Sequence, residues 1–215
     1  MKLLVAVPAY DGGITVETAR SLLNEQGAAA LTGVEFEVAF LPRCSLITQA
    51  RDQLANQFMA SDADKMIFLD SDVAWEPGAV LRLASHDVDF VGGAYRLKQD
   101  AEAYPVTWLA GEELYAVNGL LEVETLPGGF LCLSKRVFEI LAKPEHVYSH
   151  FAFTGFAFFH VPRGGGEDTR FCLDWRDSGG KVWLDPEHRL THVAGSKSYT
   201  GHIGEWIKNG SNHLQ

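Results

Sequence analysis

Short apolar runs alternate with segments of helical spacing along the first hundred residues. The first run, Leu3 to Val7, is continuous and ends at Pro8, which is typical of a buried strand that leads into a loop. Further strands are predicted over 34–41, 66–69 and 88–91. Apolar residues at helical spacing predict helices over 14–23, 45–61 and 76–83. Strands and helices in this alternation predict a right-handed, parallel α/β sheet.

The second half of the chain has shorter apolar segments in a different order. Short antiparallel strands are predicted over 104–108, 114–117 and 120–126. They are followed by helices over 134–141 and near 167–176, a last strand over 182–184 and a short helix within 201–207. We therefore expect one α/β domain over residues 1–215, with a mostly parallel central sheet and a smaller antiparallel portion.

Composition indicates a globular domain, and the net charge bears on which partners the protein can bind. The chain has 215 residues, of which 47% are hydrophobic and 21% charged, a balance typical of a globular domain with its own core. Eighteen Lys and Arg residues against 28 Asp and Glu residues give a net charge of −10. This charge opposes non-specific binding to nucleic acid, so nucleic acid is not the first partner to expect.

The cysteines and the apolar stretches bear on the location of the protein. Cys44, Cys132 and Cys172 are far apart and form no CxxC pair, which is typical of reduced thiols in a cytosolic chain. No apolar stretch reaches the roughly twenty residues that a membrane span needs, and the N-terminal run is too short for a signal peptide. We therefore expect a cytoplasmic protein without a membrane span.

Two aspartates follow the strand predicted over 66–69. If residues 69–73 remain extended, Asp70 and Asp72 point to the same side, because side chains alternate along a strand. Two adjacent carboxylates repel each other unless a cation lies between them, and a divalent metal ion is the simplest such cation. A plain turn with two aspartates is the alternative. Because ligands bind at the carboxyl ends of parallel strands, we expect a ligand site here.

Three segments in this order resemble the A-type-fold (GT-A) glycosyltransferases, in particular the family-two-like group of bacteria and phages. The segments are Val5 to Tyr10, Ile47 to Leu54 with Arg51, and Ile67 to Asp72. The resemblance covers roughly residues 3–200. It implies that about residues 1–100 bind a nucleoside-diphosphate sugar, with UDP as the expected nucleotide. It also implies that about residues 101–215 bind the acceptor and supply the catalytic groups.

The resemblance implies a donor site that includes a Mn²⁺ or Mg²⁺ ion. Its residues in this sequence are Pro8, Ala9, Tyr10 and Asp11 for the base and ribose, Arg51 for the nucleotide or diphosphate, and Asp70, Ser71 and Asp72. Asp70, Asp72 and His192 are the implied metal ligands, with His202 as a competing histidine; carboxylate and imidazole suit these ions. A turn after the first strand is the simpler alternative for Tyr10 and Asp11, and a solvated helix arginine is the simpler alternative for Arg51.

The resemblance also implies a catalytic base in the second half. Asp168, or its neighbour Glu167, would accept the proton of the acceptor hydroxyl in an inverting transfer. Acidic residues in the first turn of a helix also stabilise that helix, which is the alternative. Gly129 lies in a glycine pair that would approach the sugar and acceptor closely. A tight turn explains the pair equally well.

Other functions remain open. A non-catalytic nucleotide-binding or glycan-binding module could share this fold. A pyrophosphorylase is disfavoured because residues 8–17 contain neither Lys nor Arg, and an aspartyl phosphatase because Ala74 stands where a Thr is needed. The acceptor is a saccharide or, as a phage-type option, a hydroxymethylated pyrimidine in DNA. The second option requires a basic mouth, for which the candidates are Arg96, Lys98, Lys135, Arg136 and Arg163.

Overall fold

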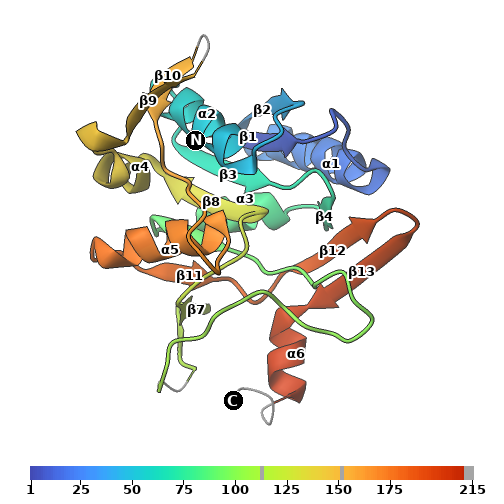
Figure 1. Cartoon of the computed structure of the whole chain (residues 1–215). Helices are drawn as coiled ribbons and strands as arrows, with labels where there is room; N and C mark the ends of the chain where they lie inside the picture. Colours follow the sequence, from blue (N-terminus) through green and yellow to red (C-terminus); the bar gives the residue numbers. More distant parts are fainter. Residues whose placement is uncertain (112–113, 151–152, 211–215) are drawn as a thin grey trace.

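The computed structural model of the chain describes residues 1–111, 114–150 and 153–210. In this part of the chain the largest element is a sheet with the strand order β2-β1-β3-β8-β5-β11-β7-β6 (Figure 1). Its strands are β1 (Lys2–Ala9), β2 (Glu35–Pro42), β3 (Lys65–Leu69), β5 (Phe90–Gly92), β6 (Ala116–Val117), β7 (Leu120–Val123), β8 (Phe130–Ser134) and β11 (Val182–Leu184). β7 and β8 run antiparallel to their neighbours, and the other strands share one direction. The predicted α/β class with a mostly parallel sheet is confirmed.

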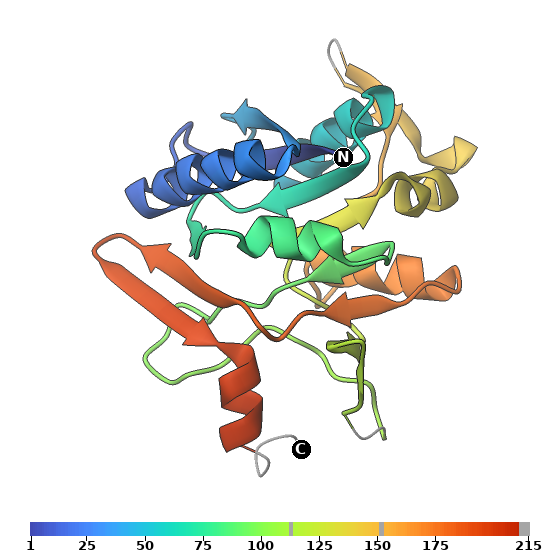
Figure 2. The ribbon, with the colours of Figure 1, turned by 180° about the vertical axis from the view of Figure 1, so that it is seen from behind.

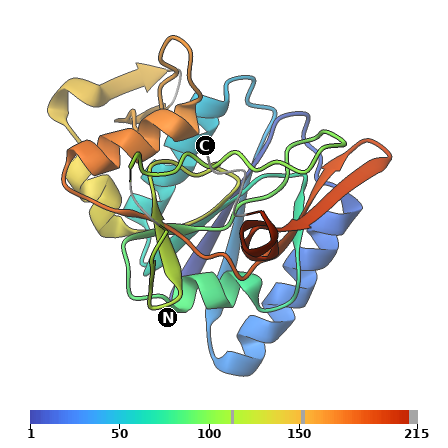
Figure 3. The same ribbon diagram turned by 90° about the horizontal axis from the view of Figure 1, so that it is seen from below.

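Helices cover both faces of this sheet, and Figure 3 shows the two groups on opposite sides. α1 (Val16–Thr32) and α3 (Ala79–Ser85) pack on the face that contains Leu3 of β1. The other face, which contains Leu4, is covered by α2 (Ile47–Ala60), α4 (Lys135–Leu141) and α5 (Glu167–Asp177). Because both faces are covered, β1 is a continuous apolar run instead of an alternating one. None of the described helices is long and apolar enough to cross a bilayer.

Two smaller sheets extend from this body. β12 (Arg189–Ala194) pairs with β13 (Lys197–His202) and with β4 (Val73–Trp75), and the chain continues into α6 (Ile203–Asn209). This hairpin and α6 project from the body at one end, as the red segments in Figure 2 show. β9 (Val147–His150) and β10 (Phe153–Phe156) follow the short 3₁₀ helix η1 (Pro144–His146) and form a second hairpin at the opposite end.

The second half differs most from the sequence predictions. Residues 104–108 do not form the predicted strand; in the described part, Thr107 makes an isolated bridge with Thr125. The segment at 182–184 is not the last strand, because β12 and β13 follow it. β8 was missed altogether, and it lies antiparallel between β3 and β5. A strand from the second half therefore separates two strands of the first.

A buried carboxylate fixes α2 to the chain that leads to α5. Asp52 of α2 accepts hydrogen bonds from the backbone N–H groups of Phe158 and Phe159, at 2.7 and 3.0 Å. Burial raises the pKa of Asp52 to about 6. The backbone is thus anchored a few residues before the glycines that precede α5, which carries two of the predicted catalytic residues.

Candidate active site

A cleft of about 400 Å³ lies at the carboxyl ends of β1 and β3, beside the first turns of α2 and α5. Ligands bind at this edge in open α/β sheets. The cleft brings together most of the predicted site residues, which lie far apart in sequence: Pro8, Ala9, Tyr10, Arg51, Asp70, Ser71, Asp72, Glu167, Asp168 and His192. Asp11 and Gly129 lie outside its lining.

The two aspartates after β3 lie in a turn and not in an extended strand. β3 ends at Leu69, and the N–H of Val73 donates to the carbonyl oxygen of Asp70 at 3.2 Å. The chain therefore turns here instead of continuing as a strand, and the two carboxylates meet different neighbours. The predicted extended geometry is wrong, although Asp70 and Asp72 both line the cleft.

Arg51 joins the end of β3 to the start of α5. Its side chain is 4% exposed, and its outer nitrogens donate to Oδ1 of Asp70 at 3.0 Å and to Oε1 of Glu167 at 2.8 Å. The hydroxyl of Tyr95 donates to the other oxygen of Asp70 at 3.0 Å. Burial opposes the charge of Arg51, but the two carboxylates outweigh it and hold its pKa above the ordinary value. A nucleotide contact by Arg51 stays a prediction.

Gly128 and Gly129 leave space for this buried network. A Cβ atom at Gly128 would lie 2.0 Å from Nη1 of Arg51, and one at Gly129 would lie 2.1 Å from Oδ2 of Asp70. The carbonyl oxygen of Gly129 also accepts the N–H of Asp70 at 3.1 Å. In this structure the glycine pair thus packs against Arg51 and Asp70, and the close approach of Gly129 to a sugar stays a prediction.

The substitution Gly128→Ala is expected to lower the free energy of unfolding by on the order of 1–3 kcal/mol, because the added methyl overlaps a guanidinium that both carboxylates hold in place. Urea unfolding measures this change. Gly27→Ala is the matched control: in α1 its Cβ meets nothing within 4 Å, and removing a helical glycine is expected to add about 0.5–1 kcal/mol. Equal effects of the two substitutions would contradict this account of Gly128.

Asp72 and His192 form the second polar group of the cleft. The imidazole Nδ1 of His192 lies 2.9 Å from the carbonyl oxygen of Arg96, to which it must donate because a carbonyl only accepts. Its other ring nitrogen, Nε2, faces Oδ1 of Asp72 at 3.5 Å. Burial opposes ionisation of Asp72, but His192 and Lys98 outweigh it and hold its pKa below the ordinary value.

Asp72 and His192 can supply part of the coordination shell of a divalent ion. A carboxylate beside an imidazole whose other nitrogen donates to a carbonyl is an arrangement found in metal sites. The described residues contain no group of three or more His, Cys, Asp or Glu side chains placed to hold a metal. Mg²⁺ and Mn²⁺ commonly use one or two protein ligands and complete their shell with substrate phosphates and water. Asp72 and His192 fit that arrangement, whereas both oxygens of Asp70 already accept hydrogen bonds.

The two acidic residues at the start of α5 have different surroundings. Glu167 lines the cleft and is paired with Arg51. Asp168 accepts the N–H of Gly128 at 3.1 Å through one oxygen and the N–H of Thr169 at 2.7 Å through the other. These backbone donors fix the position of the Asp168 carboxylate on the side of the cleft opposite the loop after β1.

The loop after β1 presents one aromatic side chain. Tyr10 is 73% exposed and lines the cleft, so its ring is accessible to a stacking ligand. Asp11 accepts the N–H of Gly13 at 2.9 Å within the turn.

The other histidine predicted as a possible metal ligand, His202, caps α6 by accepting the N–H of Glu205 at 3.3 Å. His192, and not His202, is therefore the histidine that faces the cleft.

The structure adds two residues that the sequence reasoning missed as site residues, Tyr95 and Lys98. Both follow β5, whose carboxyl end lies at the same edge as those of β1 and β3. A signal was available, because the strand predicted over 88–91 ends at a glycine pair, and the loop after it should reach the same edge. Lys98 had been considered only as part of a basic mouth.

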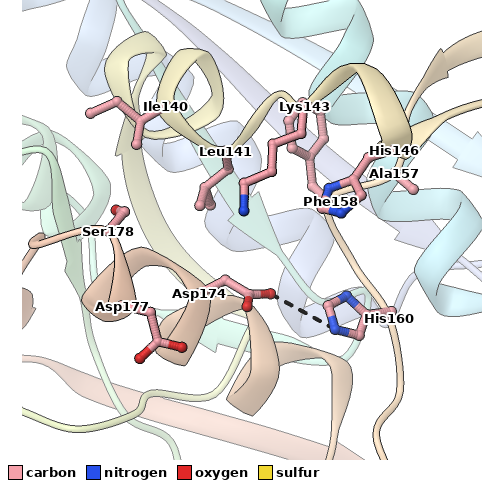
Figure 4. A pocket seen from close by; sticks show the side chains of 10 residues that line it. All are labelled: Ile140, Leu141, Lys143, His146, Ala157, Phe158, His160, Asp174, Asp177 and Ser178. Carbon is pink, nitrogen blue, oxygen red and sulfur yellow. Dashed lines mark ion pairs between the residues drawn. The ribbon is translucent and has the colours of Figure 1, made fainter.

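A second cavity, of about 200 Å³, lies between α4 and α5 (Figure 4). Its walls carry opposite charges, with Lys143 in the segment between α4 and η1, and Asp174 on α5 facing His160 at 3.9 Å. The carboxylate of Asp174 is already paired with Arg170 on the same helix. None of the residues predicted for donor binding or catalysis lines this cavity.

No protein-family model matches the chain, and no curated protein matches it by sequence. Its similarity to known proteins is structural. The STIV protein A197 superposes with a TM-score of 0.65 at 18% identity, over 93% of this chain and 94% of that chain. A mutant of Drosophila β1,4-galactosyltransferase 7, in complex with manganese, UDP-Gal and xylobiose, gives a TM-score of 0.53 at 15% identity, over 100% of this chain and 75% of that chain.

GalNAc-T7 in complex with UDP, GalNAc and Mn²⁺ gives a TM-score of 0.54 at 14% identity, over 90% of this chain and 44% of that chain. At these identities the similarity concerns the fold. The mixed sheet, the helices on both faces and the cleft at the carboxyl ends of its strands agree with that similarity. The chain therefore has the fold of the A-type glycosyltransferases.

Proposed function

We propose that this protein is a metal-dependent glycosyltransferase that moves a sugar from a nucleoside-diphosphate sugar, with UDP as the nucleotide, to an acceptor hydroxyl. One observation carries the proposal: Tyr10, the Asp72–His192 pair and Asp168 line a single cleft although they come from four separate parts of the chain. An aromatic ring, a metal-binding pair and a fixed carboxylate are the groups that such a transfer needs.

The donor side of the cleft binds and orients the nucleotide. Tyr10 stacks on the base, and Pro8 and Ala9 shape the pocket beside it. Asp72 and His192 hold a Mn²⁺ or Mg²⁺ ion, which when bound offsets the charge that develops on the departing diphosphate. Asp70, with both oxygens oriented by Arg51 and Tyr95, faces the ribose hydroxyls.

Asp168 takes the proton of the attacking hydroxyl. Its two backbone hydrogen bonds hold the carboxylate in one orientation, as a general base requires. The hydroxyl oxygen then attacks the anomeric carbon directly and the bond to the diphosphate breaks, which gives inversion at that carbon. Glu167 supports this step indirectly, since its carboxylate is held by Arg51.

A saccharide is the acceptor that the charge distribution favours. Of the basic residues considered for a DNA-binding mouth, Lys98 lines the cleft. Lys135 and Arg136 lie at the start of α4, where they bind the carbonyl oxygen of Ser61 and the carboxylate of Asp89. Four carboxylates line the same cleft, which disfavours a modified base in a DNA duplex.

Thermal unfolding with UDP tests the donor site. At 100 times its dissociation constant a ligand adds about 2.7 kcal/mol, which for a chain of this length raises the midpoint by roughly 5–11 °C. We expect this rise with UDP and Mn²⁺ together and a smaller one when a chelator replaces Mn²⁺. The variant Asp72→Asn should lose the difference, whereas Asp174→Asn, outside the cleft, should keep it. No shift with any nucleoside diphosphate would contradict the proposed function.

A further inference from the structure

Lys98 forms an ion pair with one carboxylate oxygen of Asp72, the aspartate proposed above as a metal ligand. Its Nζ lies 2.5 Å from Oδ2 of Asp72. The other oxygen of Asp72, Oδ1, faces Nε2 of His192. The ammonium group of Lys98 therefore stands beside the place where a divalent ion would bind Asp72.

Among the described residues that line the cleft, Lys98 is the cation that a ligand can reach. Arg51 is the other, but its side chain is almost fully buried and its outer nitrogens are engaged by Asp70 and Glu167. The side chain of Lys98 is 40% exposed, against 4% for Arg51. A diphosphate that enters this acidic cleft thus meets one accessible positive charge of the protein.

The backbone at Lys98 is anchored while its side chain can move. The loop after β5 is closed by a hydrogen bond from the N–H of Leu97 to the carbonyl oxygen of Ala103 at 2.9 Å. Next to Lys98, Arg96 donates to the carbonyl oxygens of Thr200 and Asp100, at 3.3 and 3.0 Å. A rotamer change can therefore carry Nζ away from Asp72 without displacing the loop.

We infer that Lys98 is a diphosphate-binding residue that neutralises Asp72 while the donor site is empty and moves to the phosphate oxygens when a divalent ion takes Asp72. The inference rests on the proposed function. An ammonium group and a divalent ion repel each other strongly on one carboxylate, so they compete for it. A lysine ammonium binds phosphate as a point charge and needs no fixed geometry, which suits such an exchange.

The exchange predicts that removing the Lys98 side chain changes the affinities for Mn²⁺ and for UDP in opposite directions. For Lys98→Ala we expect Mn²⁺ alone to bind about threefold to fivefold more tightly, because its competitor is gone. UDP is expected to bind about tenfold more weakly in the presence of Mn²⁺, because a charge-assisted hydrogen bond is lost. With chelator the loss should be smaller, because Lys98 then stays on Asp72. Free Mn²⁺ is measured by electron paramagnetic resonance, and UDP binding by calorimetry. Lys98→Arg, which keeps the charge, should restore UDP binding.

The matched control is Lys181→Ala, which removes another exposed lysine paired with a carboxylate, Glu122, at 2.8 Å and outside the cleft. It should change neither affinity. If the unmodified protein binds Mn²⁺ and UDP but Lys98→Ala changes neither affinity, or weakens both, the role of Lys98 is rejected and the donor site stands. If the unmodified protein binds neither ligand, the proposed function fails and the role of Lys98 fails with it.

Discussion

The substitution Asp168→Asn is expected to lower the rate of sugar transfer by about 10²–10⁴-fold, which is the usual contribution of a general base. The asparagine amide cannot take the proton of the acceptor hydroxyl at neutral pH. It can still accept one of the two backbone N–H groups that now bind Asp168, so α5 should form. The assay is UDP release from UDP-glucose, UDP-galactose and UDP-GlcNAc with saccharide acceptors.

A binding readout separates catalysis from donor binding in this variant. The thermal shift of Asp168→Asn with UDP and Mn²⁺ should equal that of the unmodified protein, because Asp168 acts on the acceptor. Asp174→Asn is the control on the same helix, where the carboxylate pairs with Arg170 outside the cleft, and its rate should not change. Unchanged transfer by Asp168→Asn would remove Asp168 as the base and leave the donor site intact.

The substitution Arg51→Met is expected to lower the free energy of unfolding by about 3–5 kcal/mol. The methionine fills much of the same volume, but Asp70 and Glu167 then lose their shared cation while they remain 24% and 16% exposed. Two uncompensated carboxylates close together in a partly buried site repel each other. Urea unfolding at neutral pH measures the loss, which should shrink in acid as the carboxylates become protonated.

A surface pair provides the comparison for Arg51. Arg136 is 67% exposed and pairs with Asp89 at 3.1 Å, so Arg136→Met is expected to cost at most about 1 kcal/mol. A loss for Arg51→Met as small as that for Arg136→Met would mean that the Arg51 network is not a structural link between β3 and α5.

Local patterns were enough to predict the elements around the cleft. The run from Leu3 to Val7 marks β1 because a strand covered on both faces must be apolar throughout. Helical spacing of apolar residues predicted α1, α2 and α3. The positions of Pro8 and Asp70 after predicted strands, and of Asp168 at the start of a predicted helix, indicated one edge of the sheet. These features depend on neighbours within a few residues, which the sequence displays directly.

Contacts between segments that lie far apart in sequence determined the strand order and the contacts of Asp70, which the local patterns did not predict. β8 inserts between β3 and β5, an order that a local apolar run cannot specify. The turn that contains Asp70 brings this carboxylate to Arg51 and Tyr95, which lie 19 and 25 residues away along the chain, and a pattern of near neighbours cannot specify such contacts.

The sequence by itself determined that this is an α/β protein whose acidic and aromatic side chains follow strands at one edge of the sheet, because periodicity and turn residues act locally. Only the tertiary structure decided which charges neutralise one another. It placed the almost fully buried Arg51 between the carboxylates of Asp70 and Glu167, and it paired the more exposed Lys98 with Asp72. The energy of a charge depends on burial and on partners within a few ångströms, and both are set by packing between segments far apart along the chain.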